Sequence, residues 1–233
     1  DGALLLYEGT GRRDFMATRS APRVPNADLV RLVGDVNADG YSDAVARVAG
    51  GDLMGLWGEP GGSFSAPFRV GTGWQGADLI AAIGDYTRDG VPDLVIRLPA
   101  TGRTISYPMT RSFGFLKPMP FDSGWTDLVS ITVGGTVNPD ANLDLVALDA
   151  AGTLWLQPGS GPSSTLDRIS LLSGQTDLAE LLGVGDMTGD GWPDLIARTT
   201  TGPVVMYPGG PGQTFGPSRS VLRGPWGAST SLG

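Results

Sequence analysis

Short apolar runs alternate with polar, glycine-rich segments along the whole chain. Four segments rich in aspartate each lie between two such runs, which cover 29–33 and 44–48, 79–83 and 94–98, 128–133 and 145–148, and 178–184 and 195–197. Apolar runs of four to eight residues between turn residues are typical of β-strands. No segment keeps the 3.6-residue period of an amphipathic helix. The pattern therefore predicts an all-β protein without helices.

The spacing of the aspartate-rich segments defines a repeat. They begin at positions 35, 85, 136 and 186, so the steps are 50, 51 and 50 residues. A third apolar run follows in each unit, at 53–57, 104–107, 153–156 and 204–207, and a fourth follows Phe64, Phe113 and Phe215. Units of 40–50 residues with four strands are the sequence mark of propeller blades. We predict a β-propeller of four-stranded blades of about 50 residues.

The chain is predicted to form one repeat domain, 1–233, with four complete blades and a partial blade at each end. The complete blades cover about 28–72, 78–121, 127–173 and 177–222. Residues 1–24 match the last two strands of a blade, and 223–233 match the start of another. The chain is then either a five-unit ring with a gap or part of a longer chain, which we favour because an open array exposes sheet edges. The incomplete blades also make self-association an expectation.

The aspartate-rich segments share the pattern Asp-x-(Asn/Thr)-x-Asp-Gly-x-x-Asp, which predicts calcium sites. Side-chain oxygens at positions one, three, five and nine, with the carbonyl oxygen at position seven, would converge on one point. Calcium takes six to eight oxygen ligands, whereas magnesium requires stricter octahedral geometry. We expect three to four calcium ions, one per loop. The expected ligands are Asp35, Asn37, Asp39, Tyr41 and Asp43; Asp85, Thr87, Asp89, Val91 and Asp93; Asn138, Asp140, Asn142 and Asp144; and Asp186, Thr188, Asp190, Trp192 and Asp194.

Two features limit this interpretation. The third loop has Thr136 at position one and Ala141 in place of the glycine, so we expect it to bind calcium weakly or not at all. The alternative for every loop is a turn of Asp, Asn and Gly that needs no metal. We favour the metal because three carboxylates within nine residues repel one another. An EF-hand is excluded, since its twelfth position requires glutamate and its loop requires flanking helices.

Composition and charge exclude several classes of function. The chain has a formal net charge of −8 and contains neither cysteine nor histidine. Nucleic acid is not an expected partner, because phosphate binding needs clustered Lys and Arg. Disulfides, zinc–thiolate sites and catalytic triads with histidine are also excluded. No apolar run is long enough to cross a membrane.

Several motifs of the repeat resemble a known family. Residues 34–47 and 185–198 read Gly-Asp-x-(Asn/Thr)-x-Asp-Gly-x-x-Asp followed by an apolar pair, Ala and Arg, and 154–159 read Leu-Trp-Leu-x-Pro-Gly. Phe-Gly recurs at 113–114 and 215–216. These motifs resemble the FG-GAP/VCBS repeats of integrin-α-like propellers, in the version found in secreted bacterial proteins. The resemblance implies blades around an axis, calcium in each loop, an extracellular location and a non-catalytic module of a larger protein.

Three functions remain open, and we favour a binding module for glycan or cell-wall polymer. Its candidate sugar contacts are Trp74, Trp125 and Trp226, which recur at one blade position where the fourth copy has Gln175. Aromatic rings stack on the apolar faces of sugars. The alternative, which we favour for these three residues, is that they pack between blades; Trp57 and Trp155 are expected in the core.

The second function is a protein-interaction or spacer propeller, which needs no special residues. The third is a polysaccharide-active enzyme, which would need paired carboxylates or a base. The only glutamates are Glu8, Glu59 and Glu180, and Lys117 is the only lysine. Since the aspartates are mostly used in the repeats, we expect no catalysis.

Overall fold

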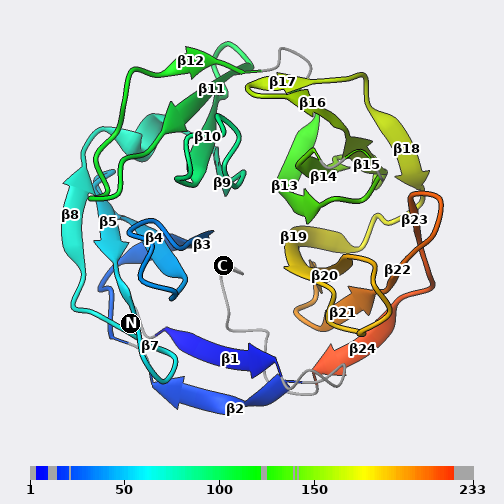
Figure 1. Cartoon of the computed structure of the whole chain (residues 1–233), viewed down its shortest axis with the longest axis horizontal. Coiled ribbons are helices and arrows are strands. Elements are labelled where there is room, and N and C mark those ends of the chain that lie inside the picture. Colours follow the sequence, from blue (N-terminus) through cyan, green and yellow to red (C-terminus); the bar gives the residue numbers. More distant parts are fainter. Residues whose placement is uncertain are drawn as a thin grey trace. The chain divides into compact units, whose positions relative to one another are not determined.

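The computed structural model describes residues 4–9, 15–20, 22–121, 125–138, 140 and 142–222. Within these residues the chain is built from β-strands, and the one helical element is a single 3₁₀ turn, η1 (Trp74–Gly76). Four antiparallel sheets of four strands each form the blades (Figure 1). The all-β propeller of four-stranded blades predicted from the repeat is confirmed. The described residues contain no helix that is long and apolar enough to cross a membrane.

Each blade uses its strands in chain order, with one hydrogen-bonded neighbour after another. Blade 1 has β3 (Ala27–Gly34), β4 (Asp43–Val48), β5 (Leu53–Leu56) and β8 (Phe68–Gly71). Blade 2 has β9 (Leu79–Ala82), β10 (Asp93–Leu98), β11 (Arg103–Pro108) and β12 (Met119–Pro120). Blade 3 has β13 (Leu128–Gly135), β14 (Asp144–Asp149), β15 (Leu154–Gln157) and β18 (Ile169–Leu172). Blade 4 has β19 (Leu178–Gly185), β20 (Asp194–Thr199), β21 (Val204–Tyr207) and β24 (Arg219–Leu222).

Short two-stranded ribbons stand between the third and fourth strands of three blades. They pair β6 (Gly58–Glu59) with β7 (Ser63–Phe64), β16 (Gly159–Gly161) with β17 (Ser164–Thr165), and β22 (Gly209–Gly210) with β23 (Thr214–Phe215). Near the N-terminus β1 (Leu5–Gly9) pairs with β2 (Phe15–Ser20), as two strands of an incomplete blade would. The incomplete blade expected at 223–233 lies outside the described residues.

The chain divides into two compact units, the first with blades 1 and 2 and the second with blades 3 and 4. The centre of each second strand is apolar, and these central residues are buried within their unit. In the first unit Val45, Leu94 and Phe113 belong to one core, and in the second unit Val146, Leu181 and Leu195 belong to another. Such continuous apolar runs are expected where both faces of a strand are covered.

Buried hydroxyl groups join blades 3 and 4 within the second unit. The Leu181 N–H donates to Ser130 Oγ at 3.0 Å, and the Gly183 N–H donates to Thr132 Oγ1 at 2.9 Å. Strand β19 thereby approaches β13 so closely that a Cβ on Gly183 would lie 1.8 Å from the Val133 carbonyl oxygen. Glycine is therefore required at this position of β19.

Candidate functional site

The four aspartate-rich loops connect the first and second strands of the four blades. Position six needs a positive φ, and glycine supplies it in three loops, with φ of 93° at Gly40, 83° at Gly90 and 91° at Gly191. Glycine adopts this left-handed conformation without steric cost. The third loop has Ala141 at this position, which lies outside the described residues.

The aspartate at position one closes its loop by accepting backbone N–H groups. Asp35 accepts from the N–H groups of Asp39 and Gly40, at 3.0 and 2.8 Å. Asp85 does the same in blade 2, accepting from Asp89 at 3.0 Å and Gly90 at 2.9 Å. In blade 4 the Gly191 N–H, with those of Asp190 and Gly189, lowers the pKa of Asp186. Thr136 offers no carboxylate for this role in the third loop.

The aspartate at position five makes a smaller turn. Asp39 accepts from the Tyr41 N–H at 2.9 Å, Asp89 from the Val91 N–H at 2.9 Å and Asp190 from the Trp192 N–H at 3.0 Å. In the third loop Asp140 accepts from the Asn142 N–H at 2.8 Å, and Asn138 Oδ1 accepts from the Asp140 N–H at 3.0 Å. The third loop thus keeps this inner turn without the carboxylate at position one.

The aspartate at position nine is buried and ties its loop to the turn after the third strand. Relative exposure is 0% for Asp43, Asp93 and Asp144 and 2% for Asp194. One carboxylate oxygen accepts a loop N–H, that of Val36, Thr87, Asn138 or Thr188, at 2.7–3.0 Å. In blades 1, 3 and 4 the other oxygen accepts the N–H of Gly58, Gly159 or Gly209, at 2.7, 3.0 and 2.9 Å.

Burial and neighbouring carboxylates raise the pKa of three position-nine carboxyl groups. Burial raises the pKa of Asp43 and Asp144, and it raises the pKa of Asp93 to about 6. The carboxylates at position five add to each rise by repulsion, although the N–H donors oppose it. A cation bound in the loop would remove this electrostatic cost.

The loop side chains supply the oxygen ligands that a hard cation prefers. In this structure the aspartates at positions one and five accept hydrogen bonds from backbone N–H groups. Among the described residues no three carboxylates lie together in a metal-binding geometry. An ion bound there would share the carboxylates at positions one and five with these N–H groups. Blade 2 fits most directly, because Asp93 Oδ1 and Thr87 Oγ1 are buried without a hydrogen-bond partner. Buried oxygens of this kind are the ligands that calcium takes.

The residues at position seven differ between loops. Tyr41 is 40% exposed and Val91 is 6% exposed, while Asn142 and Trp192 are half-buried. Tyr41 and Trp192 lie over the glycine of the adjoining turn, since a Cβ on Gly58 or Gly209 would lie 3.0 or 3.2 Å from their Cβ atoms. These two aromatic side chains therefore belong to candidate ion-binding loops.

The recurring tryptophans are buried at the starts of blades. Trp74, 7% exposed, packs on Tyr107 and Phe115 with ring centroids 5.0 and 5.1 Å apart. Trp125, 1% exposed, packs edge-on against Phe121 at 4.7 Å. Their rings are thus covered by protein, as the packing alternative expects. Trp226 lies outside the described residues.

The remaining two tryptophans have different environments. Trp57 packs in the core of the first unit, 4.5 Å from the Phe113 ring. Trp155 is half-buried, donates its indole N–H to Asp149 at 2.8 Å and carries the Arg168 guanidinium 5.0 Å above its ring. The expectation of an apolar core position for Trp155 missed these polar contacts.

An arginine near the end of the second strand connects its own blade to the segment that leads into the next blade. The sequence analysis did not identify this role. Arg97 binds Asp78 through Nε at 3.0 Å and Nη2 at 2.8 Å, and its Nη1 donates to the Trp125 carbonyl at 2.8 Å. Arg47 likewise binds Asp28 at 2.9 Å and the Ala77 carbonyl at 2.6 Å. The signal was present in the sequence, because arginine recurs at 47, 97 and 198 and an acid at 28, 78 and 180.

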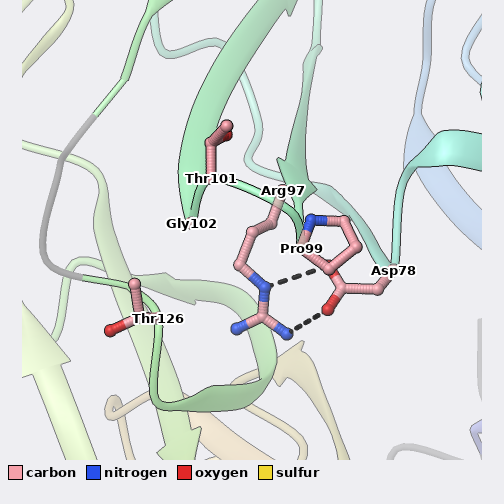
Figure 2. Close-up of a pocket in the computed structure, with 6 residues that line it drawn as sticks. All are labelled: Asp78, Arg97, Pro99, Thr101, Gly102 and Thr126. Atoms are coloured by element: carbon pink, nitrogen blue, oxygen red, sulfur yellow. Dashed lines mark hydrogen bonds and ion pairs between the residues drawn. The ribbon is translucent and has the colours of Figure 1, made fainter.

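Figure 2 shows the Arg97–Asp78 pair at a pocket of about 410 Å³, which Pro99, Thr101, Gly102 and Thr126 also line. A smaller pocket of about 150 Å³ lies at the corresponding place after blade 3. Because the Arg97 guanidinium is already bonded to Asp78 and to the Trp125 carbonyl, we assign it a structural role.

Replacing Arg97 with alanine should lower the free energy of unfolding by about 1–3 kcal/mol, because the Trp125 carbonyl and Asp78 lose a charged donor. Urea denaturation measures the change. Arg69→Ala is the matched control, since Arg69 is 65% exposed and lies 3.7 Å from Asp52. Exposed pairs contribute about 0–1 kcal/mol. Equal effects of the two substitutions would show that Arg97 does not join the blades.

Comparison with known proteins agrees with this architecture. Residues 35–96 match the model of the FG-GAP-like repeat family. The BP39L lectin from Burkholderia pseudomallei is similar in structure, with a TM-score of 0.52 and 13% identity over 95% of this chain and 64% of the lectin. The chain thus spans less than two thirds of the lectin's length. BBS1N, solved in complex with ARL6DN, has a TM-score of 0.45 and 13% identity over 95% of this chain and 62% of its own. No curated protein is significantly similar in sequence.

Proposed function

We propose that this β-propeller, of which residues 35–96 match the FG-GAP-like repeat, is a non-catalytic, calcium-stabilised extracellular binding module for glycan or cell-wall polymer. The observation that carries the calcium part is the acidic loop, which recurs at the same place in each blade and holds a buried carboxylate at position nine. Four ions would add eight positive charges to a formal net charge of −8 and bring the protein close to neutrality.

The glycan part is supported by two aromatic side chains of the loops. Tyr41 and Trp192 are partly exposed, whereas the described rings Trp74 and Trp125 are buried. Aromatic faces with a polar tip suit the apolar faces and hydroxyl groups of sugars. The lectin that shares this fold is named for such binding. We therefore propose Tyr41 and Trp192 as the sugar contacts.

The non-catalytic part is supported by the surroundings of the carboxylates. Glu180 binds Arg198 at 3.2 Å, and Glu59 accepts a hydrogen bond from Ser63 at 3.1 Å. The loop aspartates accept backbone N–H groups, as described above. These carboxylates serve structure, which leaves them poorly suited to act as a paired acid and base.

Calorimetric titration with a panel of cell-wall glycans, in calcium, tests the proposal. We expect the affinity to fall about two- to tenfold for Tyr41→Ala or Trp192→Ala, because a stacked ring contributes about 0.5–1.5 kcal/mol. Leu166→Ala is the control, since Leu166 is 55% exposed on another segment. If neither aromatic substitution changed the glycan affinity, the assignment of Tyr41 and Trp192 as sugar contacts would be wrong. No binding by any glycan would favour a protein-interaction or spacer propeller, for which exposed Leu166 and Ile169 offer an apolar contact.

A further inference from the structure

Blade 2 differs from the other blades at one residue in the turn after the third strand. Gly58, Gly159 and Gly209 pair there with Phe64, Thr165 and Phe215. In blade 2 the pairing residue is Met109, opposite Phe115. Met109 therefore occupies the position at which the other blades have glycine.

The replacement of glycine by methionine is important because the three glycines lie very close to the backbone of the preceding loop. A Cβ on Gly58, Gly159 or Gly209 would lie 2.3, 2.3 or 2.1 Å from the carbonyl oxygen of Ser42, Leu143 or Pro193. The close approach brings each glycine N–H to the position-nine carboxylate. Met109 carries a Cβ, which the glycines lack, and its N–H makes only a weak contact with Asp93 that falls short of hydrogen-bond geometry at Oδ1.

Asp93 has weaker hydrogen bonds than the corresponding aspartates as a result. Its Oδ2 accepts the Thr87 N–H at 2.8 Å, but no donor reaches full hydrogen-bond geometry at Oδ1 or at Thr87 Oγ1. The Thr87 hydroxyl and the Met109 N–H lie close enough only to lower the pKa of Asp93 in part. Both Oδ1 and Oγ1 are buried, and Asp93 is 0% exposed. Buried polar atoms normally have partners, and a buried carboxylate oxygen without one carries a large cost. A cation would provide the missing partner for both oxygens.

We propose that the loop of blade 2, residues 85–93, takes up the first calcium ion and binds it most tightly, with Asp93 Oδ1 and Thr87 Oγ1 among the ligands. This inference rests on the calcium part of the proposed function. In the other three loops the corresponding carboxylate oxygen already accepts a glycine N–H, so an ion there must share or displace that bond.

Two arginines oppose cation binding in this loop. Arg88 occupies position four, and Arg111 donates to the Gly90 carbonyl at 3.3 Å. Both are exposed, so the high dielectric constant of water weakens their repulsion of an ion. The buried oxygens are screened far less, and their missing partners therefore dominate. Arg111→Gln should raise the affinity of the loop.

Calcium titration of the chelator-treated full chain by calorimetry tests the order of filling. Thr87→Val removes an oxygen that makes no full hydrogen bond, so we expect the fold to be kept, and Asp93→Asn removes the charge. We expect each substitution to weaken the first binding step, Asp93→Asn by about tenfold or more, because ligand charge sets calcium affinity. Circular dichroism confirms folding.

The matched control is Thr188→Val in blade 4, where Thr188 Oγ1 lies 3.5 Å from Asp194 Oδ1. It should leave the first step unchanged. If neither Thr87→Val nor Asp93→Asn changed the affinity of the first calcium-binding step, the proposed order of filling would be wrong. The proposal that the loops bind calcium would not be affected. The absence of calcium binding by the unsubstituted chain would overturn the proposed function itself.

Discussion

Removing calcium should lower the melting temperature by about 5–10 °C for each loop that binds an ion. An ion that binds only the folded state stabilises it by about 2.7 kcal/mol when its concentration is 100 times the dissociation constant. For a chain of this size, 1 kcal/mol shifts the melting temperature by about 2–4 °C. A thermal melt with calcium and with excess chelator measures the difference.

Magnesium at equal ionic strength is the control for this melt. It should restore little of the lost stability, because it binds best in strict octahedral geometry and gives up its water reluctantly. A melting temperature that is the same in calcium and in chelator would contradict the assignment of the loops as calcium sites. The loops would then be turns held only by their own hydrogen bonds.

Replacing Gly183 with alanine should lower the free energy of unfolding by about 3 kcal/mol or more. The new Cβ would lie 1.8 Å from the Val133 carbonyl oxygen, which belongs to a backbone strand and cannot swing away as a flexible side chain would. Relieving the clash requires β19 to move from β13, which also breaks the bond from the Gly183 N–H to Thr132. Overpacking of a rigid site typically costs about 1–3 kcal/mol, and the lost buried hydrogen bond adds to it.

Urea denaturation of Gly183→Ala measures this loss, with Gly76→Ala as the control. A Cβ on Gly76 would meet no atom within 4 Å, so that substitution should change stability by about 0.5 kcal/mol at most. If the two variants were equally stable, the close contact between β13 and β19 would not be a determinant of stability.

The sequence predicted the blades well because their determinants are local and repeated. A loop of Asp, Asn and Gly between two apolar runs defines the first two strands, and its return every 50 or 51 residues defines the repeat. The left-handed backbone at Gly40 and Gly191 follows from the same pattern. The sequence therefore contained the fold class and the positions of the loops.

The contacts of the site were harder to predict because they join distant residues. Asp43 binds the Gly58 N–H across 15 positions, and Arg97 binds the Trp125 carbonyl across 28. Nor does a Gly-Trp motif show which way its ring faces. Trp74 was a candidate sugar contact, but its ring lies against Tyr107 and Phe115.

The internal hydrogen bonds of the loops have a consequence for the speed of ion exchange. Asp35 and Asp186 close their loops through backbone N–H groups, and Asp43 and Asp194 anchor the loop ends, by bonds that the protein makes with its own groups. An arriving ion therefore finds a backbone that is already folded, and only side chains must rotate, which takes nanoseconds or less. Uptake should then be limited by the release of water from the ion, whereas the time for release grows with the affinity of each loop, so the loop of blade 2 should empty last when external calcium falls.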